Sequence, residues 1–155
     1  MSSPPISPLA QAVDRLCLRK GSRLKDLGRA PVDRISVRRF REALGLPPDP
    51  ALGVPPMLVH HLLRPDVDVT VDVRPHETID SVLDNPVNGG TEVSFNRALR
   101  LEETISGELV LADAYLREGK SGAMAVVVTE SRYSDAQGAP VACVRSTMIY
   151  RGAKP

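Results

Sequence analysis

The sequence predicts an α+β protein, in which four long antiparallel strands form a sheet and helices from the N-terminal half cover one of its faces. β-branched residues gather in the C-terminal half, for example at residues 126–128, and they suit a pleated, buried surface. The segments 118–122 and 134–138 have the polar, glycine-ended composition of hairpin loops. Residues 140–150 alternate between apolar and polar side chains, which indicates one buried and one solvated face. The buried face needs a cover.

The strands are expected at residues 88–95, 104–117, 123–133 and 140–150. The first opens with Asn88, Gly89 and Gly90. Two glycines in a strand allow close approach of a ligand or of another backbone, and a simple β-bulge is the alternative interpretation.

The N-terminal half predicts three short elements and a rigid loop. After a tail over residues 1–7, Ser7 and Pro8 suit the start of a helix that ends near Gly21. Residues 30–35 suggest a short strand, and Ser36 suggests the N-cap of a helix that runs to Leu44. On that helix Arg38, Arg39 and Arg41 form either a phosphate contact or, as is commoner, a solvated basic face.

A proline-rich loop over residues 46–56 leads into a short apolar helix at residues 56–63. Asp49 is the only ionisable residue of the loop. The free N–H groups at the start of such a helix are able to hold an anion or polarise a carbonyl. The polar connection over residues 66–85 is long enough to be a lid or a subunit contact.

Composition excludes several functional classes. A net charge of +1 gives no bulk attraction to nucleic acid or membrane, and 3% aromatic residues make base stacking an unsuitable role. Two cysteines among 155 residues do not make a disulfide framework. The sequence shows neither a signal peptide nor a membrane span, so we expect a cytoplasmic protein of one main domain, residues 25–155, after a tail and helix at residues 1–24.

The histidines His60, His61 and His76 do not have metal-ligand spacing, so no metal site is expected. Imidazole titrates near neutrality, which makes His60 or His61 a candidate general base. A structural role for a histidine on an apolar helix is the commoner alternative.

Residues 25–151 resemble the MaoC-like dehydratases, especially their FAS1-type N-terminal half. The resemblance rests on NGG at 88–90, F-x-R-x-L-R at 95–100, EGKSGAM at 118–124, VVVTE at 126–130 and DAQGAPVACVRSTMI at 135–149. It implies a hot-dog fold, an antiparallel sheet wrapped around a central helix that would begin at residues 56–63. It also implies that two such domains pair edge to edge and that an acyl thioester enters near their interface.

The resemblance fails where the family carries its chemistry. Active members have an Asp and a His in a G-D-x-N-P-x-H stretch, whereas residues 45–52 here read GLPPDPAL, and only Asp49-Pro50 remains of N-P. Ala98 also replaces the family's Pro, and Glu102-Glu103 replaces Gly-Asp, which changes a turn.

This departure leaves three hypotheses. In the first, the chain is the substrate-binding half of a heteromeric (3R)-hydroxyacyl-thioester dehydratase or enoyl-thioester hydratase, and a second hot-dog subunit supplies the Asp and His. In the second, it is a thioesterase that uses Asp49 with His60 or His61. In the third, it only binds acyl carriers. The substrate is carried by coenzyme A or by a carrier protein, with no other cofactor. The expected pocket residues are Pro55, Met57, Leu58, Val59, Asn88, Gly89 and Gly90.

Overall fold

The computed structural model describes residues 7–64 and 83–152. Most of the predicted tail, His76 and most of the connection over residues 66–85 lie outside the described residues. The elements are α1 (Pro8–Cys17), β1 (Arg23–Pro31), α2 (Arg34–Ala43), the 3₁₀ helix η1 (Pro50–Leu52), α3 (Leu58–Leu62), β2 (Leu83–Phe95), β3 (Thr104–Gly119), β4 (Gly122–Ser134) and β5 (Pro140–Gly152).

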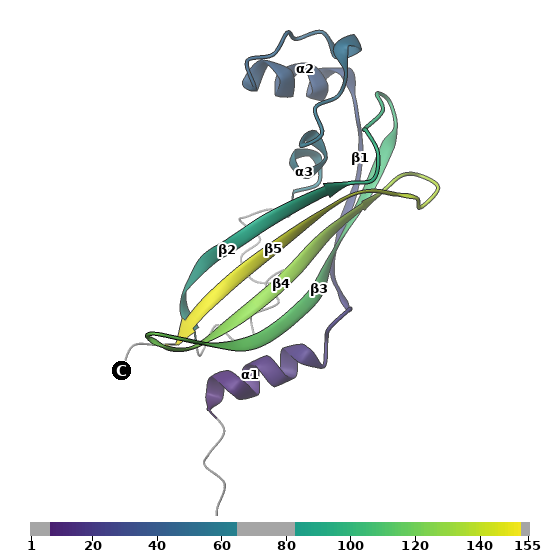
Figure 1. Cartoon of the computed structure of the whole chain (residues 1–155). Coiled ribbons are helices and arrows are strands. Elements are labelled where there is room, and N and C mark those ends of the chain that lie inside the picture. Colours follow the sequence, from purple (N-terminus) through teal and green to yellow (C-terminus); the bar gives the residue numbers. More distant parts are fainter. Residues whose placement is uncertain (1–6, 65–82, 153–155) are drawn as a thin grey trace, which may run out of the picture.

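The five strands form one open antiparallel sheet in the order β1-β3-β4-β5-β2 (Figure 1). The four predicted strands are confirmed, and each is longer than the segment predicted for it. The β3–β4 and β4–β5 connections are the two predicted hairpin loops. The strands β1 and β2 are the edges of the sheet.

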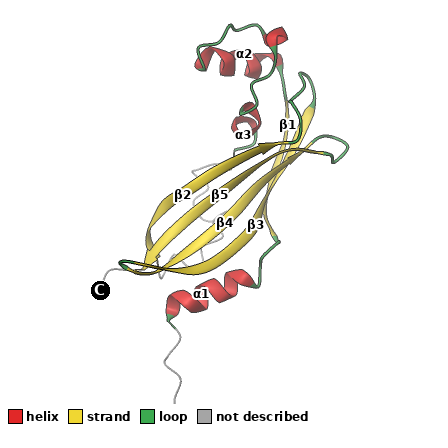
Figure 2. Ribbon diagram, in the orientation of Figure 1, coloured by secondary structure: helices red, strands yellow, loops and turns green. Residues whose placement is uncertain are grey.

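The helices pack at the two ends of the sheet, with α1 at one end and α2 and α3 at the other (Figures 1 and 2). Ala125 and Val127 of β4 pack with α1, whereas Tyr133 of the same strand packs with α3. Because side chains two residues apart lie on the same face of a strand, α1 and α3 share one face of the sheet. The N-terminal half therefore supplies the cover that the sequence requires.

The helix α1 forms as predicted. The Ser7 hydroxyl oxygen accepts a hydrogen bond from the Ala10 N–H at 3.2 Å, and Pro8 occupies the first turn. Its apolar side chains are buried against β3, β4 and β5; they are Leu9, Ala12, Val13 and Leu16. After the helix, the Gly21 N–H donates to the Leu111 carbonyl, which places the next residues beside β3.

The prediction for residues 30–35 is wrong, because the strand lies earlier and Ile35 belongs to α2. Asp33, and not Ser36, caps this helix: its carboxylate accepts hydrogen bonds from the N–H groups of Ile35 at 2.9 Å and of Ser36 at 2.8 Å. A hydrogen bond from the Ser36 hydroxyl lowers the pKa of Asp33. The charged cap is favoured because it also complements the positive end of the helix dipole.

Candidate functional site

The proline-rich loop is held in place by Arg41. The sequence predicts that this side chain lies on a basic face of α2 with Arg38 and Arg39, but it is only 7% exposed. Its guanidinium donates to the Pro47 carbonyl at 2.6 Å and to the Gly53 carbonyl at 2.8 Å. Two carbonyls from both ends of the loop thereby satisfy a buried charge, which fixes the approach to α3.

Asp49 caps η1 in the middle of this loop. Its carboxylate accepts a hydrogen bond from the Ala51 N–H at 2.9 Å, and the residue is exposed. Within the described part of the chain, the structure shows no hydrogen bond or ion pair between Asp49 and His60 or His61. Its predicted role as an acid or base stays a prediction.

The start of α3 combines buried and exposed residues of the expected pocket. Leu58 and Val59 are fully buried in the core, and Pro55 is buried beside them, whereas Met57 is 41% exposed. Of these four predicted substrate-binding residues, Met57 alone presents a large area of side chain to solvent. The other three give α3 its position against the sheet.

His60 is connected to the sheet through Tyr133. Its Nδ1 atom lies 2.9 Å from the phenolic oxygen of Tyr133 in β4, and the two rings meet edge to face. Tyr133 is 1% exposed and its ring lies over Gly107, where an added Cβ would approach the ring to 3.1 Å. A glycine at position 107 therefore leaves room for the tyrosine.

The environment of this pair keeps both side chains neutral near pH 7. Burial, and then the charge of Arg64, lower the pKa of His60 below 6.5. Burial raises the pKa of Tyr133 to about 12, although a hydrogen bond with the Ser131 side chain acts in the opposite direction.

His61 has a different environment. Its ring packs against Phe40 of α2, with ring centroids 5.5 Å apart and a tilt of 41°. The residue is exposed. His61 thus connects α3 to α2, whereas His60 connects α3 to the sheet.

Asn88, Gly89 and Gly90 lie on the exposed edge strand β2. The register with β5 shifts between Asn88 and Gly90, and the Asn88 side-chain oxygen accepts a hydrogen bond from the Gly90 N–H at 2.9 Å. Gly90 has φ +147°, which side-chain-bearing residues rarely adopt. The local structure is therefore a β-bulge, and the predicted role of these residues at a pocket mouth stays a prediction.

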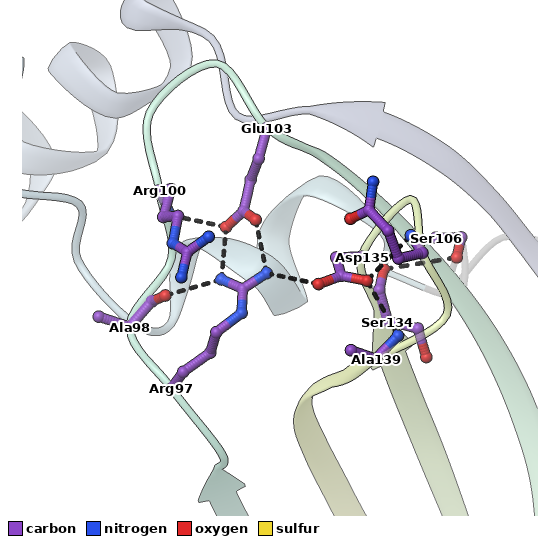
Figure 3. Close-up of polar contacts among 9 residues, drawn as sticks. Arg97, Ala98, Arg100, Glu103, Ser106, Ser134, Asp135 and Ala139 are labelled. Carbon is purple, nitrogen blue, oxygen red and sulfur yellow. Dashed lines mark hydrogen bonds and ion pairs between the residues drawn. The ribbon is translucent and has the colours of Figure 1, made fainter.

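A polar cluster joins the β2–β3 and β4–β5 loops near α3 (Figure 3). Two nitrogens of Arg97 donate to the two carboxylate oxygens of Glu103 at 2.9 and 2.6 Å. One of these nitrogens also donates to Asp135 at 3.2 Å. Leu99, between Arg97 and Glu103, is buried in the same core as α3. The cluster thus fixes a loop that packs beside the helix.

Charge pairing shifts the pKa values in this cluster. Burial raises the pKa of Glu103, but hydrogen bonds from Arg97 and the Arg100 N–H outweigh it, and the net pKa lies below 4.5. A hydrogen bond from the Ala139 N–H, together with Arg97, lowers the pKa of Asp135 below 3.8. The hydrogen bonds from Arg97 to these carboxylates raise its own pKa.

Glu102, one of the residues at which the chain departs from the pattern it resembles, lies in the turn before β3. Glu102 has φ +68°, a left-handed conformation that glycine adopts without a steric penalty. The substitution affects a turn, as predicted, and Glu102 instead forms an exposed ion pair with Arg34.

A cavity of about 400 Å³ lies on the opposite face of the sheet from Tyr133. Its walls include Arg29, Glu108 and Arg132, and none of the predicted site residues. In residues 7–64 and 83–152 there is no group of three metal-ligating side chains, and no helix is long and apolar enough to cross a membrane.

The structure brings together residues that the sequence did not connect. The partner of His60, Tyr133, is 73 positions away in the chain, and Arg97 and Asp135 lie in different loops. The only sequence signal for the last two was their place in segments shared with the family.

Comparisons identify what the chain is similar to. Residues 20–144 match the family model described as FAS1-like, dehydratase domain region. No curated protein sequence matches the chain.

Three solved structures show the same fold. One is the ChsH1-ChsH2 complex from Mycobacterium tuberculosis, with TM-score 0.71, 17% identity and coverage of 97% of this chain and 96% of that chain. The C-terminally truncated HadBC (3R-hydroxyacyl-ACP dehydratase) complex from the same organism has TM-score 0.58, 16% identity and coverage of 84% and 96%. The R-hydratase PhaJ1 from Pseudomonas aeruginosa has TM-score 0.57, 13% identity and coverage of 86% and 82%. The predicted hot-dog fold is confirmed.

Proposed function

The chain belongs to the family of FAS1-like dehydratase domains, and from this premise we propose that it is the substrate-binding half of a heteromeric (3R)-hydroxyacyl-thioester dehydratase or enoyl-thioester hydratase. One observation carries the proposal. Active members of the family have an Asp and a His in the loop that corresponds to residues 45–52, and this chain has neither residue at the matching position. Asp49 instead caps η1.

Elimination of water from a hydroxyacyl thioester needs a base at one carbon and an acid at the departing hydroxyl. Two copies of this chain would still lack the family's acid and base. A second hot-dog subunit with an intact Asp and His supplies both, and the names of two similar structures, ChsH1-ChsH2 and HadBC, are names of complexes.

The edge strand β2 is the surface we assign to this partner. An edge strand presents unpaired N–H and C=O groups, and it is a template for pairing. Val87 and Phe95 of β2 are large apolar residues that are 40% and 41% exposed. We expect the acyl thioester, carried by coenzyme A or a carrier protein, to lie near the bulge at Asn88–Gly90 and near Met57.

The test is hydration of a crotonyl-type thioester by three samples: this chain, a neighbouring MaoC-like subunit with an intact Asp and His, and the two co-expressed. Full activity is expected only in the third. If this chain alone hydrolyses acyl thioesters and gains nothing from the neighbour, it is a thioesterase. Binding without any turnover in the complex would instead favour a carrier-binding module.

A further inference from the structure

We propose that Tyr133 is a positioning residue that donates its phenolic hydrogen to Nδ1 of His60, so that His60 presents an Nε2–H donor to the ligand and is not a general base. The identity of the ligand as an acyl thioester rests on the proposed function. The assignment of the proton does not, because it follows from the hydrogen bonds of the described residues.

The first step concerns the hydroxyl of Tyr133. It is buried, at 1% exposure, and leaving its hydrogen without an acceptor would be unfavourable. Within the described residues, the geometry gives this hydroxyl a hydrogen-bond contact with Nδ1 of His60, 2.9 Å away. Nδ1 is therefore the acceptor for the phenolic hydrogen.

The second step concerns the imidazole. A neutral imidazole carries one proton, on either Nδ1 or Nε2. Since burial keeps His60 neutral and Nδ1 accepts from Tyr133, the proton is on Nε2. Nδ1 faces a fully buried tyrosine, and Nε2 lies on the other side of a ring that is only partly buried.

The third step concerns function. An imidazole with Nε2–H donates a hydrogen bond and cannot accept a proton at that atom. At a thioester carbonyl such a donor supports binding, while a partner subunit supplies the acid and base. Replacement of His60 is therefore expected to raise KM by about two- to tenfold, the range for one hydrogen bond, with little effect on kcat.

The direct measurement is a long-range ¹H–¹⁵N correlation spectrum of the imidazole rings in the full-length chain, with its partner if the two are purified together. We expect His60 to show the Nε2-protonated tautomer. In Tyr133→Phe the pKa of His60 should rise, because a hydrogen bond donated to Nδ1 stabilises the neutral ring and is lost in this variant. His61, which packs on Phe40, is the internal control and should not change.

A Nδ1-protonated signal for His60, or a fall of its pKa in Tyr133→Phe, would overturn the proposal. If Tyr133→Phe does not fold, the tautomer of the unmodified protein still decides. In the active complex, His60→Gln retains a hydrogen-bond donor. Its KM should therefore lie closer to the KM of the parent than that of His60→Ala does. A loss of kcat above a hundredfold in both variants would assign His60 a base role and contradict the proposal. Absence of all activity would count against the proposed function, whereas the spectra would still decide the tautomer.

Discussion

The guanidinium of Arg97 holds the carboxylate of Glu103 by two hydrogen bonds of 2.9 and 2.6 Å (Figure 3). The two side chains are 22% and 13% exposed, which distinguishes this pair from the Arg34–Glu102 pair, whose side chains are 63% and 68% exposed. Because a fork geometry and partial burial strengthen such contacts, the Arg97 pair is expected to support the loop beside α3.

Replacement of Arg97 tests this role. Arg97→Gln leaves two carboxylates, Glu103 and Asp135, without their cation, and it should lower the free energy of unfolding by about 1–3 kcal/mol. Arg34→Gln is the matched control and should cost less than about 0.5 kcal/mol, as exposed pairs do. Urea unfolding measures both. Equal losses in the two variants would show that burial of the Arg97 pair does not matter.

The same cluster predicts acid sensitivity. The pKa values of Glu103 and Asp135 are lower in the folded chain than their ordinary values of 4.5 and 3.8, so the unfolded chain takes up protons first as the pH falls. Their stabilising contribution is present above these ordinary values and is lost as the pH falls from them towards the folded values. Glu103→Gln should therefore show a shallower loss of stability between pH 7 and pH 3. Parallel curves for variant and parent would contradict this.

A substitution at the bulge in β2 should weaken ligand binding more than its effect on stability explains. Gly90→Ala meets open space but forces a residue with a side chain to φ +147°, so it should cost about 1–3 kcal/mol of stability. If Gly90 lies at the pocket mouth, as we expect, affinity for an acyl thioester should fall further than this loss explains. Gly21→Ala, at φ +83° and also in open space, is the control for backbone strain alone. Unchanged affinity in Gly90→Ala would leave the bulge with a purely structural role.

Local sequence patterns predict much of this fold but not its long-range contacts. The strands β3, β4 and β5 are predictable because apolar and β-branched residues alternate along them. The strand β1 is not, because it is rich in polar residues and its pairing with β3 contains two register shifts. Its existence depends on a partner strand far along the chain.

The burial of Arg41 shows that the contacts of the candidate site are equally hard to predict from the sequence. A charged residue on a helix is usually solvated, and the sequence contains no sign that the carbonyls of Pro47 and Gly53 converge on this one. His60 shows the same limit, because the sequence makes it a candidate but does not reveal its contact with Tyr133, which forms only in the folded sheet.

This chain is proposed to function with a different hot-dog subunit, and the mass of the particle in solution tests that proposal most directly. The chain should be expressed alone and with a neighbouring MaoC-like subunit that has an intact Asp and His, and each sample measured by native mass spectrometry. We expect a complex that contains both chains, and we expect only this complex to dehydrate (3R)-hydroxyacyl thioesters. A stable homodimer of this chain that does not exchange with the neighbour, and that processes acyl thioesters unaided, would contradict it.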